Sequence, residues 1–517
     1  MLVAILALGA GTLPPAAAAD VAATTASTED GGAKKATPKG AVSEAAASDA
    51  AAESGKPVEI SPLRDERSQT FANPDGTFRF KEFVQPVRTR KDGKWIDIDT
   101  TLVERADGRL APRASSTVMS ISGGGDRTFA TLTRDGTSMS VSWPANLPEP
   151  VVRGDTATYK GVLPDVDLVV RAESDGFSHV LVVKSAEAAA NPKLGAISLP
   201  VKAEGLSVDE DDDGGLVAKD AASGGTVFEA PQPVMWDSSR APVISDHRVQ
   251  AGPGPPEGAQ VADVNLAVEH GAMMLRPDTK LLRGKNTRYP VFIDPVVKTA
   301  SRTGWTWVSS ANPGLEGWKF SNSADGVESG KGVGRCPADV SVRCTGTNDV
   351  QRQYYAAPTG SLEGKTILKA QFAITLVHTY NSEARAVQLH RMNSSGGSAI
   401  NSGTNWSNRP SSKERITSES PTNPTGSCTS TNQNVRFAVT DTVKKAAASG
   451  WDTTTFGLQA ASEDTYASWK RFCNNAALEV TYNRPPYQPR MDELMMNPGG
   501  KCAYGEATSH YEPPRVR

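Results

Sequence analysis

The sequence predicts a mainly β protein built from antiparallel β-sandwiches. Two observations on composition point this way: 46 glycines and 35 prolines occur in 517 residues, and apolar residues seldom recur with helical spacing. A third is the recurrence of Asp-Gly steps between short alternating runs, at residues 75–76, 92–93, 107–108, 135–136 and 175–176. Asp-Gly tolerates the positive φ angles of tight hairpin turns. We expect an N-terminal antiparallel β-sandwich region followed by a jelly-roll-like β-sandwich with one short helix.

The N-terminus has the pattern of an export signal. An apolar run at residues 2–8 is followed by two prolines and four alanines, so we expect residues 1–19 to be a signal peptide. The positive residues that usually precede such a run are missing, and a cytoplasmic protein with an alanine-rich tail is the alternative. The run is too short to span a bilayer, and no later stretch reaches about 18 apolar residues. We therefore expect a secreted protein without a membrane span, free or associated with the cell wall.

Residues 20–57 and 58–298 differ in composition. The first segment has no aromatic residue and is rich in Ala, Ser and Thr. Such a segment cannot bury enough apolar surface to offset the entropy lost on ordering, so we expect a disordered linker. The second has alternating runs, such as residues 95–99, and a continuous apolar run at 179–183. We expect one or two antiparallel sandwiches there, with a seam near residue 150.

The next region, residues 299–484, closes with a strand, a helix and two strands. A β-type run at 435–439 leads to Thr440, a favourable N-cap residue, and then to an alanine-rich helix. Strands are expected at residues 456–460 and 478–482, where inward and outward residues alternate. One helical crossing between strands is typical of the way a jelly-roll sandwich closes.

All five cysteines lie in the C-terminal part of the chain, and their number suits an exported protein. Their spacing matches neither C-x-x-C nor a zinc finger. Cys336 with Cys344 would close a short loop. Cys428 with Cys473 would tie the loop before the helix to the last strand.

Residues 485–517 complete no pattern of their own. They contain Cys502, which either pairs with something outside this chain or has lost its partner. We expect a linker and the start of a truncated further domain, with the natural protein continuing downstream.

Several short motifs in the C-terminal region match a known family. They are VT at residues 439–440, GW at 450–451 and FGL at 456–458, together with the turn TNWSNRP at 404–410. This region resembles the closing half of the DNRLRE-type domain found in secreted bacterial proteins. The resemblance implies a β-sandwich that binds or supports rather than one that catalyses.

A second set of motifs lies upstream: DGKW, YKGVLPDVDL, GFSH and PVMW, at residues 92–95, 159–168, 176–179 and 233–236. This region resembles the N-terminal part of large actinobacterial wall proteins of the LamG type. Together the two resemblances cover roughly four-fifths of the chain. They imply the N-terminal portion of a multidomain wall protein. They imply little about activity, because most such proteins have no assigned biochemistry.

Charge and motif content argue against several function classes. A net charge of −3 and the lack of a basic cluster provide no electrostatic basis for binding nucleic acid. No G-x-S-x-G, H-E-x-x-H or protease-type cysteine motif is present. The three glycines at 123–125 open no helix, so a phosphate-binding loop is not expected. We therefore expect neither catalysis nor a cofactor.

Aromatic residues concentrate in the C-terminal sandwich and are the best candidates for ligand binding. Sugar rings stack on flat aromatic faces, and nearby amide and guanidinium groups can bind their hydroxyls. The residues that we expect to contact a glycan are Tyr466, Trp469 and Arg471 in one loop and Trp406 and Asn408 in another. The alternative, which the family resemblance favours for Trp406, is that the tryptophan packs under its loop as core.

An acidic run, DEDDDG at residues 209–214, resembles the start of a calcium-binding loop. Asp209, Asp211 and Asp213 would supply oxygen ligands at alternate positions, with Asp220 at the twelfth. However, the usual twelfth residue is Glu, and the flanking segments are strand-like. We therefore favour an acidic hairpin tip, with calcium binding as the alternative.

These observations lead to one hypothesis and two alternatives. We expect a secreted, non-catalytic binding and scaffold protein whose partner is a polysaccharide. The first alternative is a spacer or delivery scaffold for a missing downstream lectin-like or toxin domain. Exposed aromatic residues would favour binding, and only buried ones would favour the spacer. The second alternative is a glycoside hydrolase, which needs two carboxylates converging in a cleft. Asp165 and Asp167 are the nearest candidates, and a surface turn is the simpler interpretation.

Overall fold

The computed structural model describes residues 43–239, 255, 259–294, 296–299, 303–320, 322–324, 327–328, 330–337, 344, 348–428, 433–483, 495–496 and 500–501. The expected signal peptide, residues 20–42 of the expected linker, Cys502 and nearly all of 485–517 lie outside the described residues. Residues 41–517 form one compact unit. None of the helices in the described part has the length and hydropathy that crossing a membrane requires.

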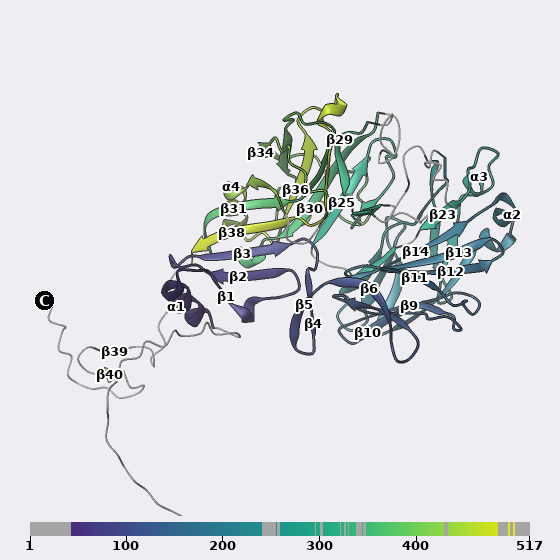
Figure 1. Ribbon diagram of the computed structural model, residues 1–517, viewed down its shortest axis with the longest axis horizontal. Helices are drawn as coiled ribbons and strands as arrows, with labels where there is room; N and C mark the ends of the chain where they lie inside the picture. The colour runs from purple at the N-terminus through teal and green to yellow at the C-terminus, as the bar shows by residue number, and fades with distance from the viewer. Residues whose placement is uncertain are drawn as a thin grey trace, which may run out of the picture. The chain divides into compact units, whose positions relative to one another are not determined.

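The described residues are mainly β, as the sequence predicts, and the strands pair antiparallel throughout (Figure 1). The helices are short. They are α1 (Glu44–Ser54), α2 (Ala186–Ala189), α3 (Thr279–Leu282) and α4 (Thr440–Ala448), with single 3-10 turns η1 (Ser61–Leu63), η2 (Pro192–Leu194), η3 (Gly360–Leu362) and η4 (Tyr466–Ser468). The large sheets form two sandwiches, each with its own apolar core.

The first sandwich pairs an eight-stranded sheet with an eleven-stranded one. The eight strands, in spatial order, are β21 (Asn265–Glu269), β22 (Ala272–Arg276), β15 (Ile197–Glu204), β10 (Thr137–Ser142), β9 (Thr128–Arg134), β8 (Val118–Ile121), β7 (Leu110–Ala114) and β6 (Asp99–Glu104). The main path of the other sheet is β11 (Val151–Arg153), β12 (Thr156–Leu163), β13 (Val166–Ala172), β14 (Gly176–Val183), β24 (Val296–Thr299), β18 (Thr226–Ala230), β17 (Leu216–Asp220) and β16 (Leu206–Glu210). Its branch is β23 (Val291–Asp294), β19 (Val234–Trp236) and β20 (Val261–Asp263).

One continuous core lies between these two sheets. Phe129 on β9 meets Phe177 on β14 edge to face, with ring centroids 6.2 Å apart. Residues 143–150 carry the chain from β10 in one sheet to β11 in the other. The predicted seam near residue 150 is therefore the crossing between two layers of one sandwich. The apolar run at 179–183 is fully buried, as expected for a strand covered on both faces.

The second sandwich pairs a six-stranded sheet with a nine-stranded one. The six strands, in spatial order, are β1 (Val58–Glu59), β2 (Ser68–Ala72), β3 (Phe78–Phe83), β38 (Ala477–Asn483), β31 (Thr366–Ile374) and β35 (Val435–Ala438). The main path of the other sheet is β32 (Leu376–Thr379), β37 (Lys470–Phe472), β29 (Lys331–Arg335), β30 (Val350–Pro358), β36 (Thr453–Ala460), β33 (Val387–Arg391) and β34 (Glu414–Glu419). On β30 it carries the branch β25 (Gly304–Ser309) and β26 (Gly317–Trp318).

The remaining strands form three small hairpins outside these sheets. They are β4 (Arg88–Lys91) with β5 (Lys94–Asp97), β27 (Ser323–Ala324) with β28 (Val327–Glu328), and β39 (Met495–Met496) with β40 (Gly500–Lys501).

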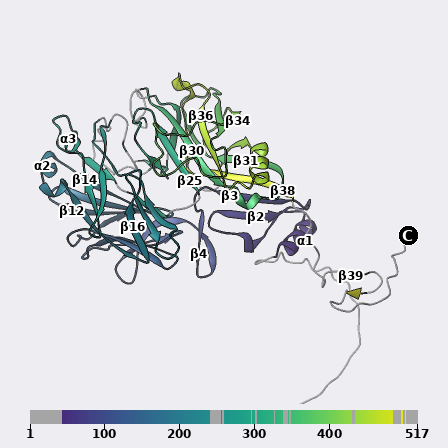
Figure 2. The same ribbon diagram turned by 180° about the vertical axis from the view of Figure 1, so that it is seen from behind.

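The N-terminal segment belongs to the second sandwich, which corrects two predicted boundaries. Strand β3 pairs with β38, from Phe78↔Tyr482 to Phe83↔Ala477. Figures 1 and 2 show purple β3 and yellow β38 side by side in both views. The prediction that 58–298 forms a separate region is therefore wrong for residues 58–83. The first sandwich is inserted between β3 and β25.

The predicted disordered linker also ends earlier than residue 57, because residues 44–54 form helix α1. Ser43 caps this helix by accepting the N–H of Ala46, and Gly55 ends it at a positive φ. Ala47 and Ala51 are fully buried against the second core. Alanine is the best helix former, and its small side chain allows close packing. Composition alone could not reveal the apolar surface on which α1 packs.

The predicted closing pattern of strand, helix and strand is confirmed, with one correction at the start of the helix. Thr440 does not cap α4 with its side chain. Its Oγ1 instead accepts the backbone N–H of Ala370 on β31, at 3.0 Å. This bond fixes the start of the helix to the neighbouring sheet. The strands β36 and β38 cover the two segments expected to be extended.

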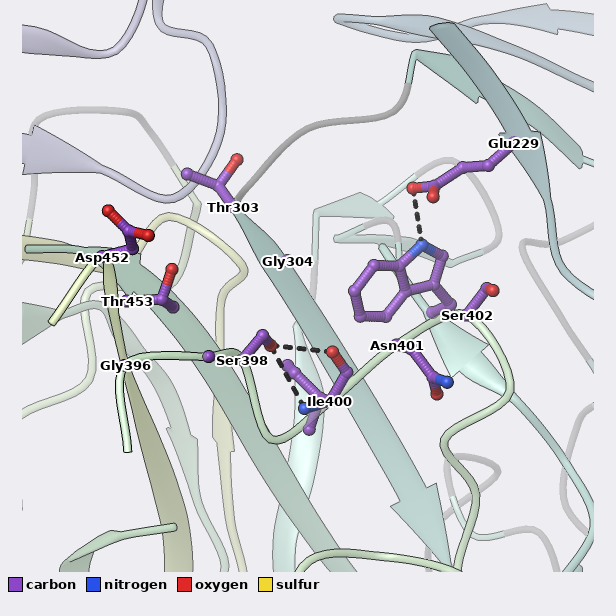
Figure 3. A pocket seen from close by; sticks show the side chains of 12 residues that line it. Glu229, Thr303, Gly304, Gly396, Ser398, Ile400, Asn401, Ser402, Asp452 and Thr453 are labelled. Carbon is purple, nitrogen blue, oxygen red and sulfur yellow. Dashed lines mark hydrogen bonds between the residues drawn. The ribbon is translucent and has the colours of Figure 1, made fainter. Parts of the chain in front are cut away.

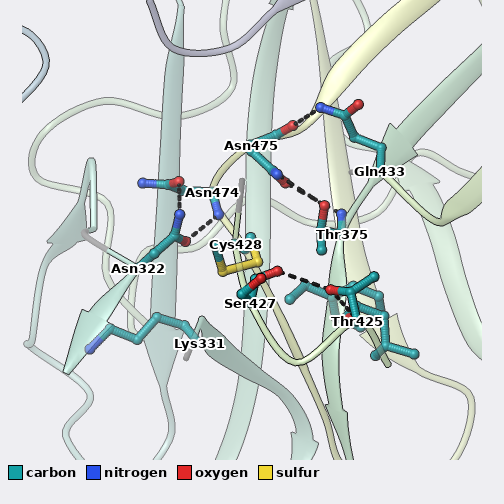
Figure 4. The surroundings of a disulfide bond; sticks show 12 residues. Asn322, Lys331, Thr375, Thr425, Ser427, Cys428, Gln433, Asn474 and Asn475 are labelled. Carbon is teal, nitrogen blue, oxygen red and sulfur yellow. Dashed lines mark hydrogen bonds between the residues drawn. A yellow bond between two sulfur atoms is a disulfide. The ribbon is translucent and has the colours of Figure 1, made fainter. Parts of the chain in front are cut away.

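Both predicted disulfides are formed. Cys336 pairs with Cys344, and Cys428 pairs with Cys473. Figure 4 shows side-chain amides around the second bond. The N–H of Asn474 donates to Asn322 Oδ1 at 2.7 Å. This disulfide ties the loop before β35 to the segment between β37 and β38.

Candidate functional site

The predicted aromatic platform around Trp469 is not accessible to a ligand. Trp469 is 2% exposed and packs against the Cys336–Cys344 disulfide. Its indole N–H donates to Gln351 Oε1 at 3.1 Å. The prediction that Trp469 contacts a glycan is therefore wrong. The polar residues that follow it suggested an exposed loop, but Lys470 is itself buried in strand β37.

The other two residues of that loop contact neighbouring side chains. Tyr466, half-buried, lies under the guanidinium of Arg335, 5.2 Å from Cζ to the ring centroid. Arg471, also half-buried, lies over Trp469 at 5.8 Å. Without an exposed Trp469, these two residues do not form a flat stacking surface.

Trp406 is half-buried beneath its own loop. It packs against an apolar cluster that includes Tyr354, and Arg409 lies over its ring at 3.8 Å. Asn408 is exposed, but its amide shapes the turn: Oδ1 accepts the N–H of Asn405 and Nδ2 donates to Gly403 O, both at 2.8 Å. This arrangement fits the alternative in which Trp406 packs as core.

The acidic run forms a hairpin tip, as favoured from the sequence. Strands β16 and β17 pair up to Glu210↔Leu216. Asp211 Oδ1 accepts backbone N–H groups of Asp213 and Gly215, at 3.0 and 2.6 Å. Within the described residues, no group of three or more His, Cys, Asp or Glu side chains could hold a metal ion. The calcium alternative for Asp209, Asp211, Asp213 and Asp220 therefore lacks a converging ligand set.

The candidate carboxylates Asp165 and Asp167 lie in and beside the turn between β12 and β13. Asp165 occupies the turn between β12 and β13 with a positive φ of 59°. Asp167 Oδ1 accepts from Lys184 Nζ at 2.7 Å and from the N–H of Gly161 at 2.9 Å. Both residues therefore have local structural roles.

A cleft that the sequence did not predict lies against the second sandwich and has a volume of about 470 Å³. One wall is Trp318 of β26, beside Gly304 at the start of β25. The loop at 396–402 and the first residue of β36 form the opposite side, and Glu229 of β18 lies at one end (Figure 3). Segments that lie far apart in the sequence thus build the cleft.

The orientation of Trp318 is fixed by three contacts. Its indole N–H donates to Glu229 Oε1 at 3.0 Å, the bond drawn to Glu229 in Figure 3. The same oxygen pairs with Lys319 Nζ at 2.7 Å, and the Lys319 side chain is fully buried. A Cβ at Gly304 would lie 2.2 Å from Trp318 Cη2, so only glycine allows the indole to lie this close to β25.

The loop at 396–402 is held in place by the buried side chain of Asn393. Its Nδ2 donates to the backbone oxygens of Ser395 and Thr453, at 2.6 and 2.9 Å, and its Oδ1 accepts the N–H of Thr455 at 2.9 Å. The loop therefore reaches the cleft in a preformed conformation. Preformed sites lose less entropy on binding than mobile ones.

The groups that this cleft presents are mostly hydrogen-bond acceptors. Asp452 is exposed at its edge. Asn401 Nδ2 donates to Asp213 Oδ2 at 3.3 Å, and Asn401 Oδ1 accepts from Thr404 Oγ1 at 3.0 Å. Ser402 and Thr453 add hydroxyls. An aromatic face beside short polar groups is the usual composition of a sugar-binding surface.

An acidic group with a shifted pKa lies two residues before Trp318. Burial, with a smaller contribution from the carboxylates of Asp213, Asp211 and Asp263, raises the pKa of Glu316 to about 8, while the backbone N–H of Gln232 opposes the shift. The N–H of Gln232 donates to Glu316 Oε2 at 3.2 Å. This contact joins the loop before β26 to the segment before β19.

Sequence reasoning missed the cleft because its parts are distant along the chain. Trp318 belongs to the aromatic concentration noted in the C-terminal sandwich, and this was the only sequence signal. Glu229 precedes it by 89 positions. Nothing in the local sequence of either residue indicates that they meet.

Comparison with known proteins identifies no family. No family model matches the chain, and no curated protein matches it significantly. Among solved structures, a Paenibacillus xanthan lyase is similar at 8% identity, with 81% of this chain and 48% of the lyase covered. The chain thus spans about half the length of that enzyme. A TM-score of 0.13 is too low to support any inference about fold or function.

Proposed function

We propose that this chain is a secreted, non-catalytic scaffold protein that binds polysaccharide through the Trp318 cleft. The observation that carries the proposal is the half-buried indole of Trp318, held by Glu229 and Gly304 at the wall of a preformed cleft. Aromatic faces take the C–H faces of sugars, and hydroxyl, amide and carboxylate groups beside them bind sugar hydroxyls.

The proposed location outside the cell rests on two features. Two disulfides are formed in the second sandwich, and structural disulfides persist mainly in oxidising compartments. The apolar run at residues 2–8 has the pattern of an export signal. The resemblance to DNRLRE-type and LamG-type wall proteins agrees with this location, on the cell wall or in the extracellular space.

Binding without hydrolysis is supported by the state of the cleft carboxylates. Hydrolysis of a glycosidic bond needs one carboxyl group to act as an acid and a second as a base or nucleophile. Glu229 Oε1 is engaged by both Trp318 and the buried Lys319. Glu229 therefore serves to orient the cleft wall.

A second candidate function is a spacer or delivery scaffold for a downstream domain. The observation that favours it is the burial of Trp469, which removes the most prominent predicted platform. On this alternative, the Trp318 cleft binds no glycan and the sandwiches serve to hold a further domain away from the cell.

Retention of the full chain on insoluble polysaccharides tests the proposal. Gly397 lines the cleft, and a Cβ there would meet nothing within 4 Å, so Gly397→Phe fills the cleft without a clash at its backbone. We expect the wild-type chain to be retained on cell wall, chitin or cellulose and this variant to lose retention. Gly314→Phe is the matched control, because its Cβ also meets open space and it does not line the cleft.

A second pair of variants probes the aromatic wall itself. Trp318→Ala should abolish retention, because stacking of a sugar ring on the Trp318 indole contributes most of the apolar contact in such a cleft. Trp95→Ala, on the separate β4–β5 hairpin, removes another half-buried tryptophan and should leave retention unchanged. Failure of the wild-type chain to bind any polymer would favour the spacer function.

A further inference from the structure

The charged side chains that line the Trp318 cleft indicate which class of ligand it favours. Among the twelve described residues that line it, none is lysine, arginine or histidine, whereas Glu229 and Asp452 are both carboxylates. Lys319 neutralises Glu229 from inside the protein, where its side chain is fully buried. The local excess charge at the rim is therefore negative.

Asp452 is the group at the rim that is available to a ligand. It is exposed, and its carboxylate makes no hydrogen bond or ion pair with any residue that the structure describes. Its backbone oxygen accepts the N–H groups of Thr359 and Gly360, at 2.8 and 3.2 Å. The main chain at Asp452 is thus anchored while the carboxylate is free to pair.

A second negative charge lies directly behind the cleft wall. Asp213 Oδ2 accepts from Asn401 Nδ2 at 3.3 Å. This bond uses one of the two N–H groups of the Asn401 amide. Thr404 Oγ1 donates to Asn401 Oδ1 at 3.0 Å, and an amide oxygen can accept a second bond. The side of the cleft formed by Asn401 therefore offers one further acceptor site and one further N–H, with the carboxylate of Asp213 behind them.

The aromatic wall suits a cation as well. The negative face of an indole attracts ammonium groups, and this attraction adds to that of nearby carboxylates. Anionic sugars, such as uronates, would instead face Asp452 with no cation in the lining to offset the repulsion.

We propose that the cleft is selective for polysaccharides that carry free amino groups. This inference rests on the proposed function of the same cleft and adds the ligand class to it. A protonated sugar amine supplies three donors and one positive charge, which match the acceptors of Asp452 and Asn401. The sugar ring stacks on Trp318, and the amine pairs with Asp452.

The test is calorimetric titration of the full chain with soluble oligomers of glucosamine, N-acetylglucosamine and galacturonate at mildly acidic pH. We expect the glucosamine oligomer to bind about threefold to fivefold more tightly than the acetylated one, the range of an exposed ion pair. The galacturonate oligomer should bind most weakly. The preference should shrink at about 0.5 M salt, because exposed charges are then screened.

Two variants separate the charge from the fold. Asp452→Asn should reduce the preference for the glucosamine oligomer over the acetylated one to less than twofold. Asp441→Asn is the matched control: Asp441 is fully exposed in the first turn of α4, away from the cleft lining, and the substitution should preserve the preference.

The outcomes are distinguishable. Equal binding of the two glucosamine-type oligomers, or an unchanged preference in Asp452→Asn, would overturn the amine selectivity and leave the proposed glycan binding intact. Binding of none of the oligomers would overturn both. An oligolysine that binds as tightly as the glucosamine oligomer would show that the cleft recognises amines without the sugar, which also overturns the proposal.

Discussion

Phe80 on β3 and Val480 on β38 are register partners in one sheet, although 400 positions separate them in the chain (480 − 80 = 400). Both side chains are buried in the second core. Because β38 also pairs with β31, the N-terminal strands complete a sheet whose other members come from the C-terminal region. The second sandwich therefore consists of residues 58–83 together with strands from residues 299–484.

The first prediction concerns this shared sheet. A chain that begins after residue 84 lacks α1 and strands β1 to β3 and exposes the edge of β38. We expect it to lose cooperative unfolding of the second sandwich, measured by near-ultraviolet circular dichroism against urea. Phe80→Ala in the full chain should destabilise this sandwich by about 3 kcal/mol. Leu63→Ala is the control, since Leu63 is 47% exposed, and should change stability little. Cooperative unfolding of the truncated chain would contradict the shared sheet.

The second prediction concerns His179, which is buried in the first core between Phe129 and Phe177. Within the described residues neither of its ring nitrogens has a hydrogen-bond partner. Burial lowers the pKa of His179 to about 3, against an unfolded value of 6.5. The unfolded chain therefore binds the extra proton first, and stability should fall as the pH drops from 6.5 toward 3, by up to about 4–5 kcal/mol.

Urea unfolding as a function of pH checks this. His179→Phe should remove most of the loss below pH 6.5, because no proton is then taken up on unfolding at this position. His270→Asn is a suitable control: His270 is exposed in the turn between β21 and β22 at a positive φ that Asn tolerates. An equally steep loss of stability below pH 6.5 in the His179 variant would show that protonation of His179 does not cause it.

The third prediction concerns Glu82, a buried carboxyl on β3. Burial, and then the carboxylate of Asp65, raise the pKa of Glu82 to about 8, while Arg67 opposes the shift. The folded state therefore holds a proton that the unfolded chain has lost above its value of 4.5. Stability from this group is complete below pH 4.5 and is lost as the pH rises through 8, by up to about 4–5 kcal/mol.

Glu82→Gln should keep the neutral form and flatten the decline in stability between pH 5 and 8. The measurement is the urea midpoint across this range. Glu104→Gln, an exposed position on β6, should follow the wild-type profile. An unchanged decline between pH 5 and 8 in the Gln variant would show that the pKa of Glu82 is not raised in the folded protein.

The fourth prediction concerns the two disulfides. The Cys428–Cys473 bond closes a span of 45 residues and the Cys336–Cys344 bond a span of 8. On the chain-entropy account, replacing the first pair by serine should cost about 4 kcal/mol and the second about 2.5 kcal/mol. Denaturant unfolding of both double variants tests the order. A larger loss from the shorter loop would mean that the packing of Trp469 on Cys336 and Cys344, and not chain entropy, dominates.

Local signals account for what could be predicted of the fold. Asp-Gly steps at 92–93 and 135–136 form turns in which both residues have positive φ. The positions of these turns could therefore be predicted from the residue types alone. The continuous apolar run at 179–183 is the buried end of β14, because both faces of the strand are covered there. The two cysteine pairs are the ones considered from the sequence, which left their connectivity open: one joins residues 8 positions apart and the other residues 45 positions apart.

The candidate site was poorly predictable because burial is decided by what packs from elsewhere. Trp469 has polar neighbours in sequence, yet a disulfide and Gln351 cover it. Trp318 has an equally unremarkable sequence context, yet Gly304 and Glu229 hold it at a cleft. Exposure of an aromatic residue follows from the surfaces of distant segments, which one sequence read locally does not contain.

The sequence by itself determined that this protein is mainly β and where its turns and the helix α4 lie. Each of these depends on residues close together in the chain or on the conformations that single residues allow. Only the tertiary structure decided that β3 joins β38 and that Trp318 meets Glu229. Strand pairing uses backbone hydrogen bonds that almost any sequence can make, so the choice of partner rests on the apolar faces that each sheet must bury together.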